Sequence, residues 1–167
     1  MSGDRTGTFR AVAAAGLLAG TLDIVAACVN FMIATGGANP VIVLQYIASG
    51  VFGAAAFQHG PWFGLWGLFF HYVIAMSWTA LFFALYPRLR LLRRSTIASG
   101  VVYGAVVWAC MANIIVPLSI VRPVQQTFMK VLLAIAILIV CIGLPVAWRA
   151  GRHYARQQGD QSSRPAV

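Results

Sequence analysis

Residues that could do chemistry are scarce in this chain, and two of them draw attention because they lie inside long apolar segments. Asp23 is the only acid within any apolar segment, and His71 lies within another long one. A charged group in the middle of a membrane costs at least about 2.5 kcal/mol to insert, so an intramembrane acid is a functional candidate by default. Because histidine titrates near neutral pH, an Asp23–His71 pair could pass a proton or sense acidity.

The same two residues also have a purely structural interpretation. A neutral Asp23 that is hydrogen-bonded to His71 or Asn113 would only hold helices together, and such a bond contributes about 1 kcal/mol in a membrane. Asp23 and His71 lie at matching depths, about 16 Å and about 14 Å from the outer ends of their helices. We expect Asn30, Gln45 and Asn113 to complete a polar cluster that opens toward the outer face.

Other kinds of chemistry lack the residues that they need. The chain contains no HExxH, GxSxG or GxxxxGK[ST] motif and no pair of acids in its apolar segments. His59 and His153 fall outside the apolar segments, which leaves His71 without a second axial ligand for haem. The three cysteines have no CxxC spacing. We therefore expect no enzymatic activity, no metal and no cofactor.

The elements that must position Asp23 and His71 are membrane helices. Hydrophobic residues make up 60% of the 167 residues and charged residues only 9%, which is too few for the surface of a soluble domain. Four segments reach the length of about 20 residues that a hydrocarbon core requires. We predict an all-α, polytopic transmembrane bundle in one domain (1–154), followed by a polar, disordered tail (155–167). The predicted spans are 9–34, 62–86, 97–118 and 128–148.

A fifth apolar segment, residues 40–57, is short, and charge placement decides its role. Short cytoplasmic loops collect Arg and Lys. With four spans, the loop Arg88–Arg94 lies on the same side as both tails, while Thr35–Pro61 has no Lys or Arg and Ser119–Thr127 has only Arg122. With five spans, the arginine-rich loop would lie outside. We therefore predict that 40–57 is re-entrant or interfacial, with a fifth span left open because the length is near the lower limit.

The same charge pattern predicts where the protein resides and what it contacts. It places both termini in the cytoplasm, in a bacterial inner membrane. The net charge of +9 gathers at segment edges without interleaved aromatic residues, so we expect no nucleic-acid partner. The loop Arg88–Arg94 and the carboxyl tail are candidates for contact with anionic lipids, or they merely set the orientation.

Small residues indicate which helix faces pack. Gly16, Gly20 and Asp23 share one face of the first span, so close packing there turns Asp23 inward. Gly100 and Gly104 form a second GxxxG motif on the third span, and they point away from most polar residues of that helix. We expect both motifs to pack helices, and the second is a candidate contact for a homodimer.

Residues spread between positions 16 and 148 resemble small bacterial inner-membrane proteins of the YagU-like group. The resemblance implies a helical membrane protein without agreed functional residues and a loose link to acid tolerance. It is carried by Leu44-Gln45-Tyr46-Ile47-Ala48-Ser49-Gly50 with Ala56-Phe57, by His71 followed by Trp78, and by Tyr103-Gly104 with Asn113 and Pro117-Leu118-Ser119.

Two functional hypotheses follow. In the first, Asp23 and His71 serve proton-linked or small-solute permeation, or a response to acid. In the second, the chain is a non-transporting structural or assembly partner within the membrane. Substitution of Asp23 by Asn separates them, because only the first predicts a loss of activity at normal folding and abundance.

Overall fold

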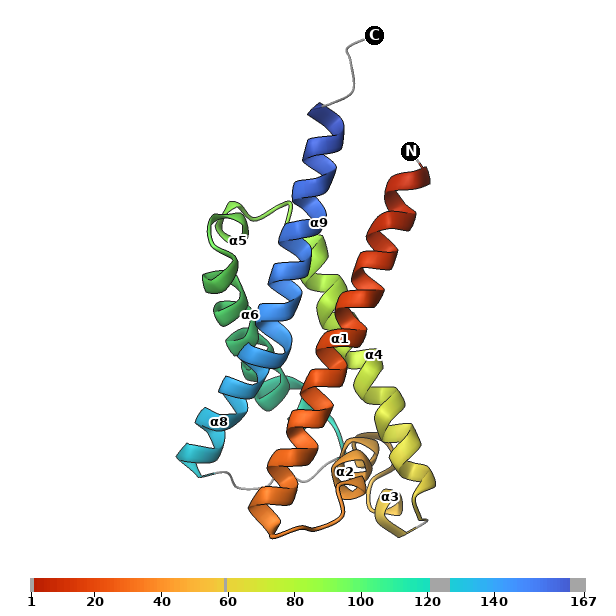
Figure 1. The fold of residues 1–167 in the computed structure, drawn as a ribbon. Coiled ribbons are helices and arrows are strands. Elements are labelled where there is room, and N and C mark those ends of the chain that lie inside the picture. Colours follow the sequence, from red (N-terminus) through yellow and green to blue (C-terminus); the bar gives the residue numbers. More distant parts are fainter. Residues whose placement is uncertain (1, 59, 121–126, 163–167) are drawn as a thin grey trace.

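Four long apolar helices form the body of the protein (Figure 1). A computed structural model describes residues 2–58, 60–120 and 127–162, so His59, Arg122 and Arg164 lie outside the described residues. The described part of the chain contains helices and no strand, and four helical stretches are long and apolar enough to cross a membrane. The predicted polytopic helical fold is thus confirmed. The four stretches are Thr6–Thr35, Trp62–Leu85, Thr96–Leu118 and Phe128–Gly159.

Shorter elements complete the described chain, and two of the spans each contain one π-helical turn. In chain order, the elements are α1 (Ser2–Thr35), α2 (Val41–Phe52), α3 (Ala55–Gln58), α4 (Trp62–Leu85), α5 (Arg90–Arg94), α6 (Thr96–Cys110), the π-helical turn Met111–Ile115, α7 (Val116–Leu118), α8 (Phe128–Leu138), the π-helical turn Ile139–Gly143 and α9 (Leu144–Ser162).

The spans alternate in direction, so the two ends of the bundle differ. Figure 1 shows both chain termini and α5 at one end, which we call the terminal end, and α2 with α3 at the other, which we call the α2 end. The arginine-rich helix α5 therefore lies at the same end as both termini. This is the arrangement that four spans require.

The segment between the first two spans stays at the α2 end. Helix α2 has 12 residues, which cover about 18 Å and fall short of a hydrocarbon core of about 30 Å. It packs closely against α4, where a side chain at Gly67 would overlap the backbone carbonyl of Leu44. Gly53, with φ of +59°, ends α2. The prediction of four spans is confirmed, and this segment does not form a fifth.

Each π-helical turn precedes a proline by the same distance. Met111–Ile115 ends two residues before Pro117, and Ile139–Gly143 ends two residues before Pro145. A proline has no N–H, and its ring crowds the carbonyl four residues earlier, which in both cases lies inside the π-helical turn. The wider turn accommodates this crowding without ending the span.

The second GxxxG motif packs against the fourth span of the same chain. A Cβ atom on Gly104 would lie 2.6 Å from Cα of Ile139, and one on Gly143 would lie 2.0 Å from the carbonyl oxygen of Gly100. Only glycine permits this approach of two backbones. Gly100 and Gly104 thus lie at the contact between the third and fourth spans. The homodimer contact expected at this motif has no free surface there, because the fourth span covers it.

The carboxyl tail is helical for longer than its composition indicates. Helix α9 continues to Ser162, so the prediction of disorder is wrong for residues 155–162. Tyr154 donates a hydrogen bond to the carbonyl of Phe83 at 2.8 Å, and Gln157 lies 3.5 Å from the hydroxyl of Thr8. These contacts hold the polar end of α9 against α4 and α1.

Candidate functional site

His71 connects two spans in the middle of the bundle. The side chain extends from α4 and is buried, and its Nε2 atom lies 2.8 Å from the carbonyl oxygen of Gly20 on α1. Because a carbonyl oxygen can only accept a hydrogen bond, Nε2 carries the proton and donates it. The tautomer of a neutral His71 is thereby fixed.

The first GxxxG motif makes this bond possible. A Cβ atom on Gly16 would lie 2.5 Å from Sδ of Met76, and one on Gly20 would lie 3.1 Å from Cβ of Ala75. A side chain at Gly16 would require the end of the Met76 side chain to move, and one at Gly20 would press against Ala75 and Tyr72. Gly16 and Gly20 thus lie at the contact between α1 and α4.

Asp23 lies on α1 almost one helical turn after Gly20. Its side chain is half-buried, and it lies close enough to His71 for the two charges to interact. At 1.5 Å per residue, Asp23 is about 18 Å from the last residue of α1, and His71 is about 14 Å from the first residue of α4. Among the described residues, no hydrogen bond to the Asp23 carboxylate is present, so Asp23 takes no part in the bond that joins His71 to α1.

Three further residues lie near this pair, and the sequence patterns did not single them out. Cys141 lies within electrostatic range of Asp23, in the π-helical turn of the fourth span. The hydroxyl groups of Tyr72 and Thr21 are 2.8 Å apart and form a second bond between α4 and α1. Pro145, four residues after Cys141, is the only sequence signal that marks this part of the fourth span.

The other three predicted members of the polar cluster lie elsewhere. Asn113 is exposed and donates to the carbonyl of Ala109 on its own helix at 2.8 Å. Gln45 donates to the carbonyl of Gly60 at 3.1 Å, at the α2 end. Asn30 is half-buried on α1, about 10 Å along the helix from Asp23. Of the predicted cluster members, His71 is the one that the described contacts bring near Asp23.

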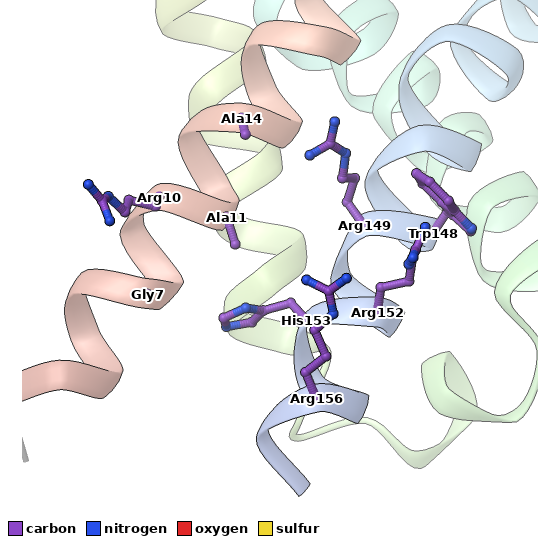
Figure 2. A pocket seen from close by; sticks show the side chains of 9 residues that line it. All are labelled: Gly7, Arg10, Ala11, Ala14, Trp148, Arg149, Arg152, His153 and Arg156. Carbon is purple, nitrogen blue, oxygen red and sulfur yellow. The ribbon is translucent and has the colours of Figure 1, made fainter. Parts of the chain in front are cut away.

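Two grooves lie at the terminal end, on opposite flanks of the polar half of α9. One, of about 520 Å³, is formed with α1, and Figure 2 shows its lining residues. The other, of about 480 Å³, is lined by residues of α5, including Arg90, Arg93 and Arg94. Within the described residues, no group of His, Cys, Asp and Glu is arranged to hold a metal ion.

Comparison of the chain with family models, with curated proteins and with solved structures found no match. The fold and the site therefore define the protein by class. It is a four-span helical membrane protein with a histidine-bonded contact between its first two spans, next to an intramembrane aspartate.

Proposed function

We propose that this protein serves a proton-linked function or a response to acid in the membrane, and that Asp23 and His71 are the groups that titrate. One observation carries the proposal: Asp23 lies in the middle of a span near His71, and none of the residues that the structure describes forms a hydrogen bond with its carboxylate. An acid at this depth costs free energy that a purely structural residue would recover through a bond.

The bond to Gly20 determines how His71 can take part. Nε2 is occupied by the carbonyl of Gly20, so Nδ1 is the ring nitrogen that can gain or lose a proton without breaking the contact between α1 and α4. Protonation of Nδ1 makes His71 a cation and favours an ionised Asp23 nearby. The charge of the pair then depends on the pH.

A change of charge at this place acts on a tight helix contact. Gly20 and Ala75 bring α1 and α4 together beside the pair, and Cys141 brings the fourth span close to Asp23. Asp23 of the first span thus lies near His71 of the second span and within electrostatic range of Cys141 of the fourth. A proton that arrives or leaves would alter how these spans pack, which is the kind of bistable element that a pH response needs.

The experiment compares Asp23→Asn with Asn113→Ala. Each variant removes or neutralises one polar group of a span, but Asn113 bonds only within its own helix. We expect purified wild-type protein in liposomes to take up protons in response to an imposed gradient, or cells that contain it to survive acid better than cells without it. Asp23→Asn should abolish the effect, Asn113→Ala should retain it, and both should melt near the wild-type temperature. Normal activity of Asp23→Asn would contradict the proposal.

A non-transporting structural or assembly partner is the second candidate. It is favoured by the His71–Gly20 bond, since an interhelical bond of this kind stabilises a bundle without any titration. Under this alternative, Asp23→Asn changes stability or nothing at all, and no acid-dependent activity is measured for the wild type.

We also propose a bacterial inner membrane with both termini in the cytoplasm. The support is that the arginines of α5 and of α9 lie at the same end as both termini, and cytoplasmic loops collect such residues. A response to acid would agree with the link to acid tolerance that the resemblance to YagU-like proteins implies.

A further inference from the structure

The groove between α1 and α9 has a strongly basic lining. Helix α1 contributes Arg10 and small residues, and α9 contributes Arg149, Arg152 and Arg156. In Figure 2, Arg149 and Arg156 extend from α9 along the groove, and the ring of His153 points toward α1. Three arginines of one helix thus share a concave surface instead of spreading around the helix.

Within the side chains that the structure describes, no acid offsets the positive charge of this groove. Among the described side chains, no carboxylate pairs with any of its four arginines. Arg152 lies over the ring of Trp148, with 4.8 Å between its Cζ atom and the ring centroid. This contact fixes the guanidinium but leaves its charge unneutralised. An anion is the group that the lining favours.

Arg149 provides the most specific observation. Its Nε atom is buried and has no hydrogen-bond partner. Buried donors in proteins are bonded with few exceptions, and each exception needs an explanation such as a bound ion or ligand. Arg88 differs from Arg149 in both respects, because its side chain is exposed and its Nη1 atom donates a hydrogen bond to the carbonyl of Ala84 at 2.6 Å. Exposed basic residues such as Arg88 are sufficient to set the orientation of the protein in the membrane, and a buried, unbonded donor such as Nε of Arg149 is not needed for it.

The groove lies at the level where lipid head groups are found. The apolar part of α1 begins at Phe9, and that of the fourth span ends at Trp148, whose ring is half-exposed. Tryptophan at the end of an apolar block is typical of the boundary between membrane and water. A volume of about 520 Å³ is within the range of small-molecule sites.

We propose that this groove binds the head-group phosphate of one anionic phospholipid. The guanidinium of Arg149 donates to the phosphate oxygens and Arg156 supplies further charge beside it, whereas the Arg10 side chain extends from α1 away from α9 (Figure 2). Guanidinium forks match phosphate oxygens in geometry, which a diffuse basic surface does not. Arg10 of this groove precedes Asp23 on α1 by about 20 Å along the helix, and occupancy of the groove does not depend on the function proposed for Asp23 and His71.

The test counts lipids bound to the full-length protein by native mass spectrometry. Phosphatidylglycerol and phosphatidylcholine are titrated separately against the wild type, Arg149→Gln, Arg149→Lys and the control Arg88→Gln. Arg149→Gln and Arg88→Gln remove the same charge at the same end of the bundle. We expect a preference for phosphatidylglycerol in the wild type, a loss of about tenfold or more in its affinity with Arg149→Gln, and a change within about twofold with Arg88→Gln. Arg149→Lys should recover only part of the loss.

Three results would overturn the proposal. The first is an equal loss of phosphatidylglycerol affinity in Arg149→Gln and Arg88→Gln. The second is equal binding of the two lipids by the wild type. The third is displacement of phosphatidylglycerol by millimolar inorganic phosphate, which would identify a soluble anion as the ligand. Should Arg149→Gln fold poorly, Arg156→Gln replaces it, because the Arg156 side chain is exposed and its loss leaves the packing intact. The same loss of affinity is expected there, and its absence counts against the proposal.

Discussion

The Nε2 atom of His71 and the carbonyl oxygen of Gly20 are 2.8 Å apart, and this bond joins α4 to α1 next to Asp23. The carbonyl oxygen of Gly20 is accessible to the imidazole because neither Gly16 nor Gly20 has a side chain that would hold α4 at a greater distance. The packing motif and the titratable pair are therefore one structural unit. A change in either is expected to affect the other.

Two substitutions of His71 distinguish its hydrogen bond to Gly20 from its ability to take up a proton. In His71→Gln, the side-chain amide can still donate to the carbonyl of Gly20, but it does not titrate. We expect a melting temperature close to that of the wild type and a loss of acid-dependent activity. In His71→Leu, the bond is also lost, and the free energy of unfolding should fall by about 1 kcal/mol. Thermal melting in detergent and the liposome assay measure the two effects, and full activity of His71→Gln would show that His71 is structural.

The contact between the third and fourth spans makes a prediction about stability. A Cβ atom on Gly143 would lie 2.0 Å from the carbonyl oxygen of Gly100, whereas a Cβ atom on Gly7 would meet no atom within 4 Å. Gly143→Ala should therefore force the backbones apart and destabilise the protein by about 1 to 3 kcal/mol. Gly7→Ala is the matched control and should melt like the wild type. Equal melting of both variants would contradict the close packing of these spans.

Topology can be tested with single cysteines at Ala38 and Leu89 in a chain whose three native cysteines are replaced. Leu89 lies beside α5 at the terminal end, and Ala38 lies between α1 and α2 at the other end. If the arginines of the terminal end are cytoplasmic, a membrane-impermeant maleimide should label Ala38→Cys in intact cells and Leu89→Cys only after permeabilisation. The reverse pattern would invert the protein in the membrane.

The number of spans was predictable because length and charge placement are local properties of the sequence. The close approach of α1 and α4 was also predictable, since Gly16 and Gly20 recur at helical spacing. The partner of Gly100 and Gly104 was not, because a small-residue face looks the same whether a second copy or a neighbouring span covers it.

The site was only partly predictable. Asp23 and His71 could be paired by depth, but depth alone does not say which side of a helix a residue faces, and Asn113 is exposed. The basic groove escaped notice for a different reason. Arg149, Arg152 and Arg156 recur at spacings of three and four, which places them on one face of a helix. This spacing indicates a shared face only if the helix continues beyond the membrane, and the polar composition of residues 155–167 favoured a disordered tail instead.

The π-helical turn in the fourth span has a geometric consequence for this groove. Such a turn is equivalent to one extra residue inserted into an α-helix, and each residue advances an α-helix by about 100°. The face of α9 that carries Arg149 is therefore rotated by about that angle from the position that an unbroken helix counted from Lys130 would give it. A helical wheel drawn over the whole span assigns this arginine to the wrong side, and deletion of one residue within Ile139–Gly143 would turn the arginine face away from α1.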